Sequence, residues 1–333
     1  MNTVFHAQTA GSPASGPGGS AAARQNLGRS IVLAALFLLA LAIGVAGSCP
    51  SPPPREYRHV VILGDPHLPG RHLAAKEQAR RTINNWPDVD LVTAVGDICE
   101  LYGTPAEYAA ARSFFARLTH PLALVAGNHD SIYATPDQAN ANTFYPASPD
   151  ERADKLARYR QTFHLPALSF SRMLGGYLLV FVSTDHDRFA VGISDQQLDW
   201  LRTELARAPR TPTIIVFHGP LLGTQYPFKR YINQPHSVAQ PVESIHALLA
   251  ANPQVFLWIS GHTHTPPTEP SYAAPINLYD GRVVNIHNTD MKRETIWTNS
   301  LLLYPDRVVV KTYNHRDRRW LPELERTIRP PRL

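Results

Sequence analysis

The stretch PLALVAGNHD, residues 121–130, decides the fold class, because it joins a short apolar run to three consecutive polar side chains. The apolar part is too short for an ordinary helix and predicts a buried strand. Gly127 permits a sharp turn as the chain leaves that strand, and Asn128, His129 and Asp130 follow it. Polar groups at the mouth of a buried strand are costly unless they are paired. Either the tetrapeptide is a capped turn, or other segments bring partners to it.

Four other apolar runs end in a similar way. Helical patterns over residues 71–86 and 105–118 separate the first strands from one another, and this alternation predicts an α/β domain. Polar groups that follow such strands are expected at the carboxyl edge of a sheet, where α/β proteins place their sites. The four runs and the polar segments that follow them are 57–63 with Gly64-Asp65-Pro66-His67, 91–95 with Gly96-Asp97, 213–217 with His218-Gly219-Pro220, and 255–260 with Gly261-His262-Thr263-His264.

The remaining pattern extends this α/β arrangement. Residues 131–172 are polar and irregular, apart from a predicted helix at 149–163, and are expected to pass over the site. After Gly281 the pattern changes to consecutive strands, which predicts a strand-rich C-terminal part. The further expected elements are strands at 177–183, 282–286, 300–304 and 307–313, and helices at 194–208 and 242–250, the first of these capped by Ser194 with Gln197 in the capping-box position.

The polar strand ends together form a metal-ligand set. Two pairs are spaced i, i+2, which places both side chains on one side of an extended backbone. The set is large enough for two divalent ions with mixed nitrogen and oxygen ligands, and such ligands suit Zn, Mn or Fe rather than Ca. Its members are Asp65, His67, Asp97, Asn128, His129, His218, His262 and His264.

In their order along the chain, these five motifs resemble the calcineurin-like metallophosphoesterase family over about residues 57–315. The resemblance implies a four-layer αββα sandwich in which the strand-rich C-terminal part supplies the second sheet. It also implies two divalent metal ions. Asp65, His67 and His264 would bind one ion, Asn128, His218 and His262 the other, and Asp97 would bridge them.

The same resemblance implies a metal-dependent phosphoric ester hydrolase. A hydroxide that bridges the two metals would attack phosphorus in line with the ester bond of a phosphomono- or diester. His129 would be the catalytic residue, either stabilising the transition state or protonating the leaving oxygen. Asp130 either orients that imidazole or caps the turn, and Glu100 at most supports the ligands from behind.

Two other functions are weighed against this one. A catalytically silent, membrane-tethered module that binds metal or phosphate is the alternative; the complete motif set argues against it. A metal-independent hydrolase lacks support, because no G-x-S-x-G elbow is present and Cys99, set among apolar residues, is typical of a small buried side chain. Specificity is expected from residues 131–172 and 221–241, with Tyr226 and Arg230 as candidate substrate contacts.

The composition argues against a nucleic-acid partner and excludes few other functions. The formal net charge is +5, but no basic run is interleaved with aromatic residues, so no nucleic-acid partner is indicated. The part after residue 56 is long enough for one large domain with its own core, or at most two domains. Residues 316–333 are rich in arginine and are predicted to be a solvated basic tail. Nothing in the sequence indicates an oligomeric state.

The N-terminal residues 1–49 predict export. Residues 31–46 form an uninterrupted apolar run, followed by small residues and Cys49. Either the run is a lipoprotein signal that leaves Cys49 lipidated, or it is retained as a transmembrane anchor. Both alternatives tether the domain on the periplasmic or extracellular side of a membrane, through a proline-rich linker at residues 50–56.

Overall fold

The computed structural model describes residues 55–136 and 144–332. The predicted export segment at residues 1–49 and most of the predicted linker at residues 50–56 lie outside this part of the chain. Within the described ranges, no helix is both long and apolar enough to cross a membrane.

The first sheet is built around the strand–helix alternation that the sequence predicts. β1 (Arg58–Leu63), β2 (Val89–Val95) and β3 (Leu122–Val125) are adjacent parallel strands. α2 (Leu73–Asn84) and α3 (Pro105–Phe115) connect them. β1 and β2 are buried along nearly their whole length, as is typical of parallel strands that are covered on both faces. The carboxyl ends of the three strands therefore open at one edge of the sheet.

The second sheet also has a parallel centre. Its strands and connecting helices are β4 (Ser169–Leu174), β5 (Tyr177–Val182), α6 (Asp195–Arg207), β6 (Thr213–Phe217), α7 (Val242–Ala251), β7 (Val255–Ser260), β8 (Leu278–Tyr279) and β9 (Val283–His287). The strand order is β4-β5-β6-β7-β9-β8, with β5, β6, β7 and β9 parallel. Ser194 caps α6 by accepting a hydrogen bond from the Gln197 amide at 3.3 Å, as predicted.

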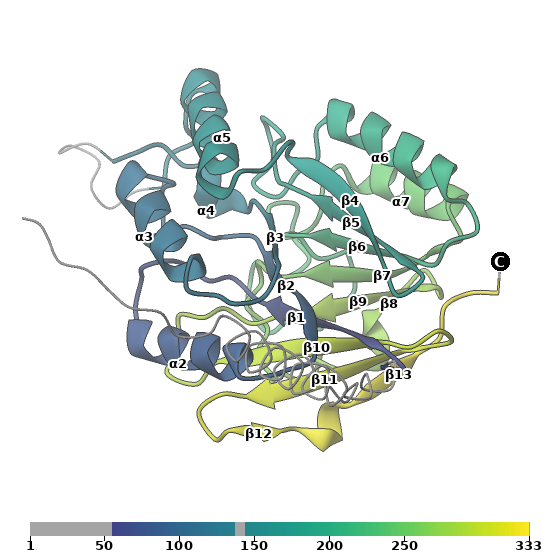
Figure 1. The fold of residues 1–333 in the computed structure, drawn as a ribbon. Helices are drawn as coiled ribbons and strands as arrows, with labels where there is room; N and C mark the ends of the chain where they lie inside the picture. Colours follow the sequence, from purple (N-terminus) through teal and green to yellow (C-terminus); the bar gives the residue numbers. More distant parts are fainter. Residues whose placement is uncertain (1–54, 137–143, 333) are drawn as a thin grey trace, which may run out of the picture. The chain divides into compact units, whose positions relative to one another are not determined.

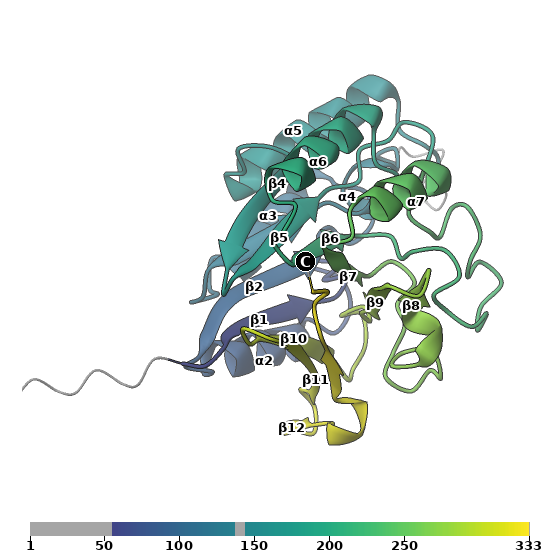
Figure 2. The same cartoon turned by 90° about the vertical axis from the view of Figure 1, so that its right-hand side faces the viewer.

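Three buried apolar clusters define four layers (Figures 1 and 2). Ile62 of the first sheet and Phe181 of the second belong to the cluster between the two sheets. The outer face of the first sheet packs against α2, α3 and α5 (Pro149–Phe163), and the outer face of the second against α6 and α7. The predicted αββα sandwich is confirmed.

The expected source of the second sheet is wrong for most of the C-terminal part, since of the strands expected after Gly281 only the first, observed as β9, lies in that sheet. β10 (Trp297–Leu303) pairs antiparallel with β1, and β11 (Val308–Asn314) pairs with β10, so these C-terminal strands extend the first sheet. The second sheet consists of strands from residues 169–287. The physical reason is that β1 has an edge opposite β2 that needs a hydrogen-bonding partner, and β10 covers it.

The segment predicted as a solvated tail contains two strands. β12 (Arg319–Trp320) and β13 (Arg326–Ile328) both pair with β11, with a short 3-10 turn at Pro322–Leu324 between them. The indole of Trp320 stacks on Trp86, with ring centroids 5.3 Å apart. The many arginines mask this pattern, because charged side chains are common on an edge strand.

Residues between β3 and β5 are more regular than their sequence suggests. A single turn, α4 (Asn128–Ser131), follows β3, and α5 packs against both α3 and α4. β4 lies within the stretch predicted to be irregular; it is a partly exposed edge strand and therefore lacks the apolar run by which the other strands are recognised. A short 3-10 turn at Pro275–Asn277 precedes β8.

The packing of Trp320 yields a stability prediction. Replacing Trp320→Ala removes its contacts with Trp86 and with Tyr313, whose ring centroid is 4.9 Å away. We expect the free energy of unfolding to fall by about 1–3 kcal/mol, because an aromatic pair contributes beyond its buried area. Urea denaturation measures this change, with the neighbouring exposed Arg316→Ala as control. Equal stability of the two variants would contradict a structural role for the segment.

Candidate metal centre

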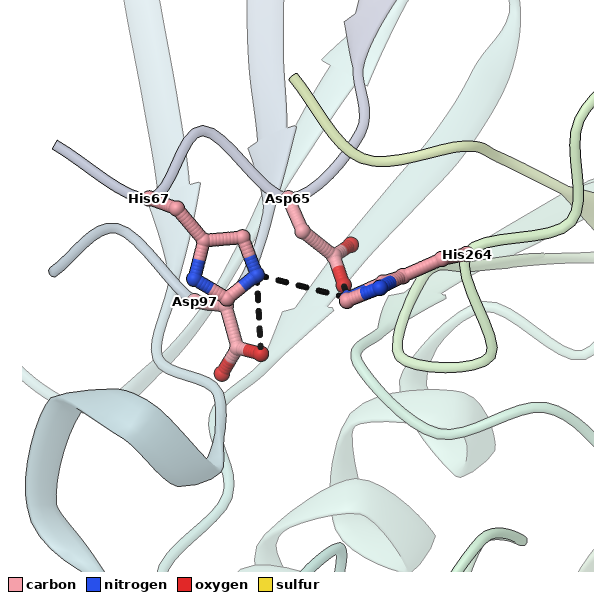
Figure 3. Close-up of side chains that lie close together, drawn as sticks. All are labelled: Asp65, His67, Asp97 and His264. Carbon is pink, nitrogen blue, oxygen red and sulfur yellow. Dashed lines mark hydrogen bonds and ion pairs between the residues drawn. The ribbon is translucent and has the colours of Figure 1, made fainter. Parts of the chain in front are cut away.

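The loops that leave the strands converge where the carboxyl edges of the two sheets meet. The Thr184 amide, after β5, donates to the carbonyl of Ala126, after β3, at 3.0 Å and joins the sheets. Within the first sheet, the His67 amide donates to the Asp97 carbonyl at 2.8 Å. Figure 3 shows the side chains of the first ligand cluster meeting from separate segments. These connections bring the strand-end residues predicted as ligands together.

The first cluster consists of Asp65, His67, Asp97 and His264, with potential ligand atoms all within 4.8 Å of one another. His264 Nε2 lies 2.9 Å from Asp65 Oδ2 and 3.3 Å from His67 Nε2. His67 Nε2 lies 3.6 Å from Asp97 Oδ2. Asp65, His67 and Asp97 are buried, and the His264 side chain is 22% exposed, so the cluster has one face toward solvent.

The second cluster shares Asp97 with the first. Asp97, His218 and His262 bring one ligand atom each within 4.8 Å of the others. Asn128 Oδ1 lies 3.0 Å from His218 Nε2, and the same nitrogen lies 3.2 Å from Asp97 Oδ1. Asp97 therefore directs one carboxylate oxygen toward each cluster.

The four histidines present the correct nitrogen for metal binding. In three of them one ring nitrogen faces a backbone carbonyl, so that nitrogen carries the proton: His67 Nδ1 with Glu100 at 3.0 Å, His218 Nδ1 with Val95 at 2.7 Å, and His262 Nε2 with His236 at 3.1 Å. In His264, Nδ1 lies 3.4 Å from Asp290 Oδ2. The other nitrogen of each ring then has its lone pair free, which is the arrangement that second-shell partners impose on metal-bound histidine.

The buried charge of the centre also fits bound cations. Asp65 and Asp97 are at most 1% exposed, and among the described residues only histidines approach them as ion-pair partners. Asp65 Oδ1 is buried and has no hydrogen-bond partner in the described part of the chain. Buried carboxylates are costly unless they are paired or coordinate a metal. The mixed N and O donor set therefore fits divalent ions, and the prediction of ligands for them is consistent with this geometry.

Four ligand candidates have a left-handed backbone. The φ angles are 45° at His67, 50° at Asp97, 62° at His262 and 52° at His264. Such conformations cost about 1–3 kcal/mol each when the residue is not glycine, and they cluster at functional sites. Each of the four residues lies two to four positions past the end of its strand, in a loop that contributes to the centre.

Glycine permits the close approach of these loops. A Cβ atom on Gly127 would overlap the amide nitrogen and carboxylate of Asp97, and one on Gly261 would overlap the carboxylate of Asp65. The first of these contacts crosses between neighbouring loops, and the second crosses between the sheets. The glycines that end the strands are thus required for space.

The carboxylates and histidines of the centre shift one another's pKa values. Burial disfavours charge on His218, but Asp97 and Asp65 outweigh it and raise its pKa to about 9. Burial and the neighbouring His218 lower the pKa of His262 to about 3. Burial works against the Asp97 carboxylate, yet His218 and His129 hold the pKa of Asp97 well below its usual range. The centre thus attracts positive charge.

His129 and Asp130 serve different purposes. His129 Nδ1 lies 2.9 Å from the carbonyl of Leu101, and Nε2 faces the centre, 3.9 Å from Asp97 Oδ2. Asp130 accepts hydrogen bonds from the backbone amides of Gly127, Ile98 and Cys99 at 2.7–3.1 Å. Of the two roles considered for Asp130, the structure supports the turn: its carboxylate holds the loops after β2 and β3 together.

Two contributors were missed by sequence reasoning. Asp290 contacts His264 and the guanidinium of Arg293, and it follows β9 just as the predicted ligands follow their strands, which is the signal that could have identified it. Lys76 is fully buried and donates to the carbonyls of His67 at 2.6 Å and Pro69 at 3.1 Å. No sequence signal marks a lysine on α2 as part of this site.

Other polar residues lie in the loops that follow β2, β5 and β6. Glu100 accepts from the Gly70 amide at 3.1 Å and supports the loop that carries His67. Asp185 accepts from Ser194, at the start of α6, and His186 from the Arg188 amide, so both hold a local turn. Tyr226 is 47% exposed, and its role, like that of Arg230, stays a prediction.

Solved structures share this fold. A dimetal phosphatase from Danio rerio has a TM-score of 0.56 and 14% identity, and the match covers 82% of this chain and 99% of that one. Purple acid phosphatase PPD1 from yellow lupin (Lupinus luteus) has a TM-score of 0.58 and 16% identity, and the match covers 82% of this chain and 54% of that one. At these identities the likeness shows the fold alone.

Sequence comparison identifies the family. The family model described as calcineurin-like phosphoesterase matches residues 58–266, and the chain belongs to that family. A 3',5'-cyclic-nucleotide phosphodiesterase from Nostoc sp. (strain PCC 7120) is 28% identical over 178 residues, or 54% of this chain. The matched region spans 57% of the length of that relative. The resemblance seen in the five motifs is thereby confirmed.

The contacts of Lys76 lead to a prediction. In Lys76→Met the carbonyls of His67 and Pro69 lose a buried donor, so we expect the free energy of unfolding to fall by about 1–3 kcal/mol. Lys311→Met, at a surface pair with Glu325, is the control and should change stability by less than about 0.5 kcal/mol. Urea denaturation compares them. Equal stability of the two variants would show that the carbonyls find other donors.

The position of Asn128 yields a prediction for metal content. Asn128→Ala removes a neutral oxygen from the second cluster only, so we expect the affinity for one of two metal equivalents to fall by at least about tenfold. Elemental analysis of dialysed protein, together with metal titration, measures this loss. Loss of both equivalents, or of neither, would contradict the assignment of Asn128 to one site.

Proposed function

We propose that the protein is a dinuclear metal-dependent phosphoesterase that hydrolyses phosphomono- or diesters. The observation that carries this proposal is that two ligand clusters share one buried carboxylate, Asp97. Membership of the calcineurin-like phosphoesterase family supports a phosphoester hydrolase in general. The residues proposed as ligands are Asp65, His67, Asp97, Asn128, His218, His262 and His264.

Two divalent ions, when bound, would supply positive charge for the phosphoryl oxygens and a water molecule of lowered pKa. The protein positions the Asp97 carboxylate and the His129 imidazole. Asp97 is fixed because its Oδ1 also accepts the backbone amide of His129 at 2.9 Å. The same contact ties the backbone of His129 to the centre, and a phosphate ester bound there would be within reach of the His129 imidazole, whose Nε2 lies 3.9 Å from Asp97 Oδ2.

The proton on His129 can be placed. The Leu101 carbonyl accepts a hydrogen bond from Nδ1, so a neutral ring has its lone pair on Nε2, the nitrogen that faces the centre. To protonate a leaving oxygen from Nε2, the ring must therefore be cationic. Burial lowers the pKa of His129, although Asp97 works in the opposite direction, so the cationic form depends on the negative charge of a phosphate ester bound beside the ring, which raises the pKa of an imidazole.

His129→Ala tests this role. The imidazole is close to the centre but belongs to neither ligand cluster, so we expect both metal equivalents to remain and kcat to fall by about 10²–10⁴-fold. Turnover of bis(p-nitrophenyl) phosphate and p-nitrophenyl phosphate, with metal analysis of the same samples, measures both effects. His246→Ala on α7, whose ring contacts Tyr279, is the control. Full activity of the His129 variant would contradict the catalytic assignment.

Metal removal separates the proposal from its alternative. A catalytically silent module would bind metal but turn over no ester. We expect chelation to abolish hydrolysis and Mn, Zn or Fe to restore it. Because the relative from Nostoc is named a 3',5'-cyclic-nucleotide phosphodiesterase, cyclic nucleotides are the first natural diesters to test. Inactivity of the metal-loaded protein on every mono- and diester would favour the silent module.

We also propose that the domain is exported and tethered to a membrane on the periplasmic or extracellular side. The support is the apolar run at residues 31–46 with Cys49 after it. Either lipidation of Cys49 or a retained transmembrane segment would provide the tether. Mass spectrometry of the membrane fraction distinguishes the two: a chain that begins at a lipidated Cys49 indicates lipidation, and a chain that keeps residues 31–46 indicates a transmembrane segment. Recovery of the unaltered protein in the soluble cytosolic fraction would contradict export.

A further inference from the structure

We propose that the aromatic surface formed by Tyr133 and Phe144 beside His129 binds a planar aromatic group of the substrate, such as a nucleobase or an aryl ring. The inference rests on the proposed function, because it concerns the substituent of a phosphate ester held at the same centre. Nothing in the five motifs or in the family match assigns these two residues a role. They come from the segment that follows α4 and from the chain just before α5.

The rings of this surface lie against the proposed catalytic histidine. The His129 ring centroid is 5.1 Å from that of Tyr133 and 5.6 Å from that of Phe144, and the Phe144 ring meets His129 almost perpendicularly, at 87°. Tyr133 and Phe144 are themselves 4.8 Å apart. Tyr102, from the loop after β2, lies 5.4 Å from Phe144 and is 9% exposed, so it supports that ring from behind.

The same surface is connected to the metal ligands. The Tyr133 hydroxyl accepts a hydrogen bond from Asn128 Nδ2 at 3.1 Å, which leaves Asn128 Oδ1 toward His218. The hydroxyl of Tyr133 thus contacts the proposed metal ligand Asn128, and the ring of Tyr133 contacts Phe144. A substituent on the His129 side of a phosphorus atom bound at the centre would lie near these rings.

Exposure makes Phe144 the principal contact. Its side chain is 48% exposed although it is a large apolar ring packed on one side against other aromatics. Single exposed apolar residues are common and need no explanation. This one, however, borders a polar centre, where a stacked ring would remove apolar area from water on both partners. Stacking on aromatic side chains tolerates many rings, because every base has a π-face.

Equilibrium binding to the manganese-loaded full chain tests the proposal without turnover. Four phosphonates, whose C–P bond is not an ester, serve as probes in calorimetry: methyl-, octyl- and phenylphosphonate, and an acyclic adenine nucleoside phosphonate. We expect the two aromatic probes to bind about tenfold tighter than methylphosphonate or more. If only the adenine probe gains affinity, the aromatic group is a nucleobase. An equal gain for phenylphosphonate indicates any aryl ring.

Variants test whether the aromatic surface causes the tighter binding of the aromatic phosphonates. Phe144→Ala should weaken the affinity for the aromatic probes by about tenfold and leave the affinity for methylphosphonate unchanged. Met173→Ala is the matched control, because Met173 is 55% exposed and pairs with Leu178 near the opposite end of the second sheet. Equal weakening of all four probes by Phe144→Ala would show a structural role and overturn the proposal. So would octylphosphonate binding as tightly as phenylphosphonate, which would indicate a lipid-like chain.

The binding and hydrolysis experiments distinguish failure of this proposal from failure of the proposed function. If the aromatic probes bind as expected but no ester is turned over, the hydrolase proposal fails and the ligand class stands. If esters are hydrolysed while wild-type protein binds phenyl- and methylphosphonate equally, the aromatic surface is not used and the hydrolase proposal stands.

Discussion

Two carboxylates that are buried without a lysine or arginine partner in the described residues, Asp65 and Asp97, are the constraint on which the rest of this structure depends. Ionised carboxylates are tolerated in such a place only when something compensates their charge. In this protein histidines surround them, and most of those rings direct a lone pair inward because a backbone carbonyl takes the other nitrogen. The fold therefore prepares a negative, nitrogen-rich centre for cations.

The αββα sandwich positions the residues of this centre. Parallel strands in both sheets end at the same edge, and Asp65 of the first sheet accepts the backbone amide of His262 of the second at 2.9 Å. The left-handed backbone at the ligand positions is unfavourable by itself. Buried contacts offset it, including those of Lys76 with the loop that carries His67 and those of Asp130 with the loop after β2.

Much of the site was predictable from the sequence because its signal is local: a buried strand, a glycine, then a ligand-type side chain. The missed features depend on tertiary pairing. Strand β10 reads as a strand, but its place beside β1 is decided by which edge is open. Asp290 has no motif of its own, and only its position after β9 brings it to His264. The rings of Tyr133 and Phe144 lie in a stretch without periodicity, so no pattern could place them beside His129.

Anomalous diffraction from crystals of the manganese-loaded protein tests the central claim most directly. The account predicts two anomalous peaks with the Asp97 carboxylate between them, one peak near Asp65, His67 and His264 and the other near Asn128, His218 and His262. A single peak, or peaks distant from Asp97, would contradict the claim that one buried carboxylate organises two metal sites.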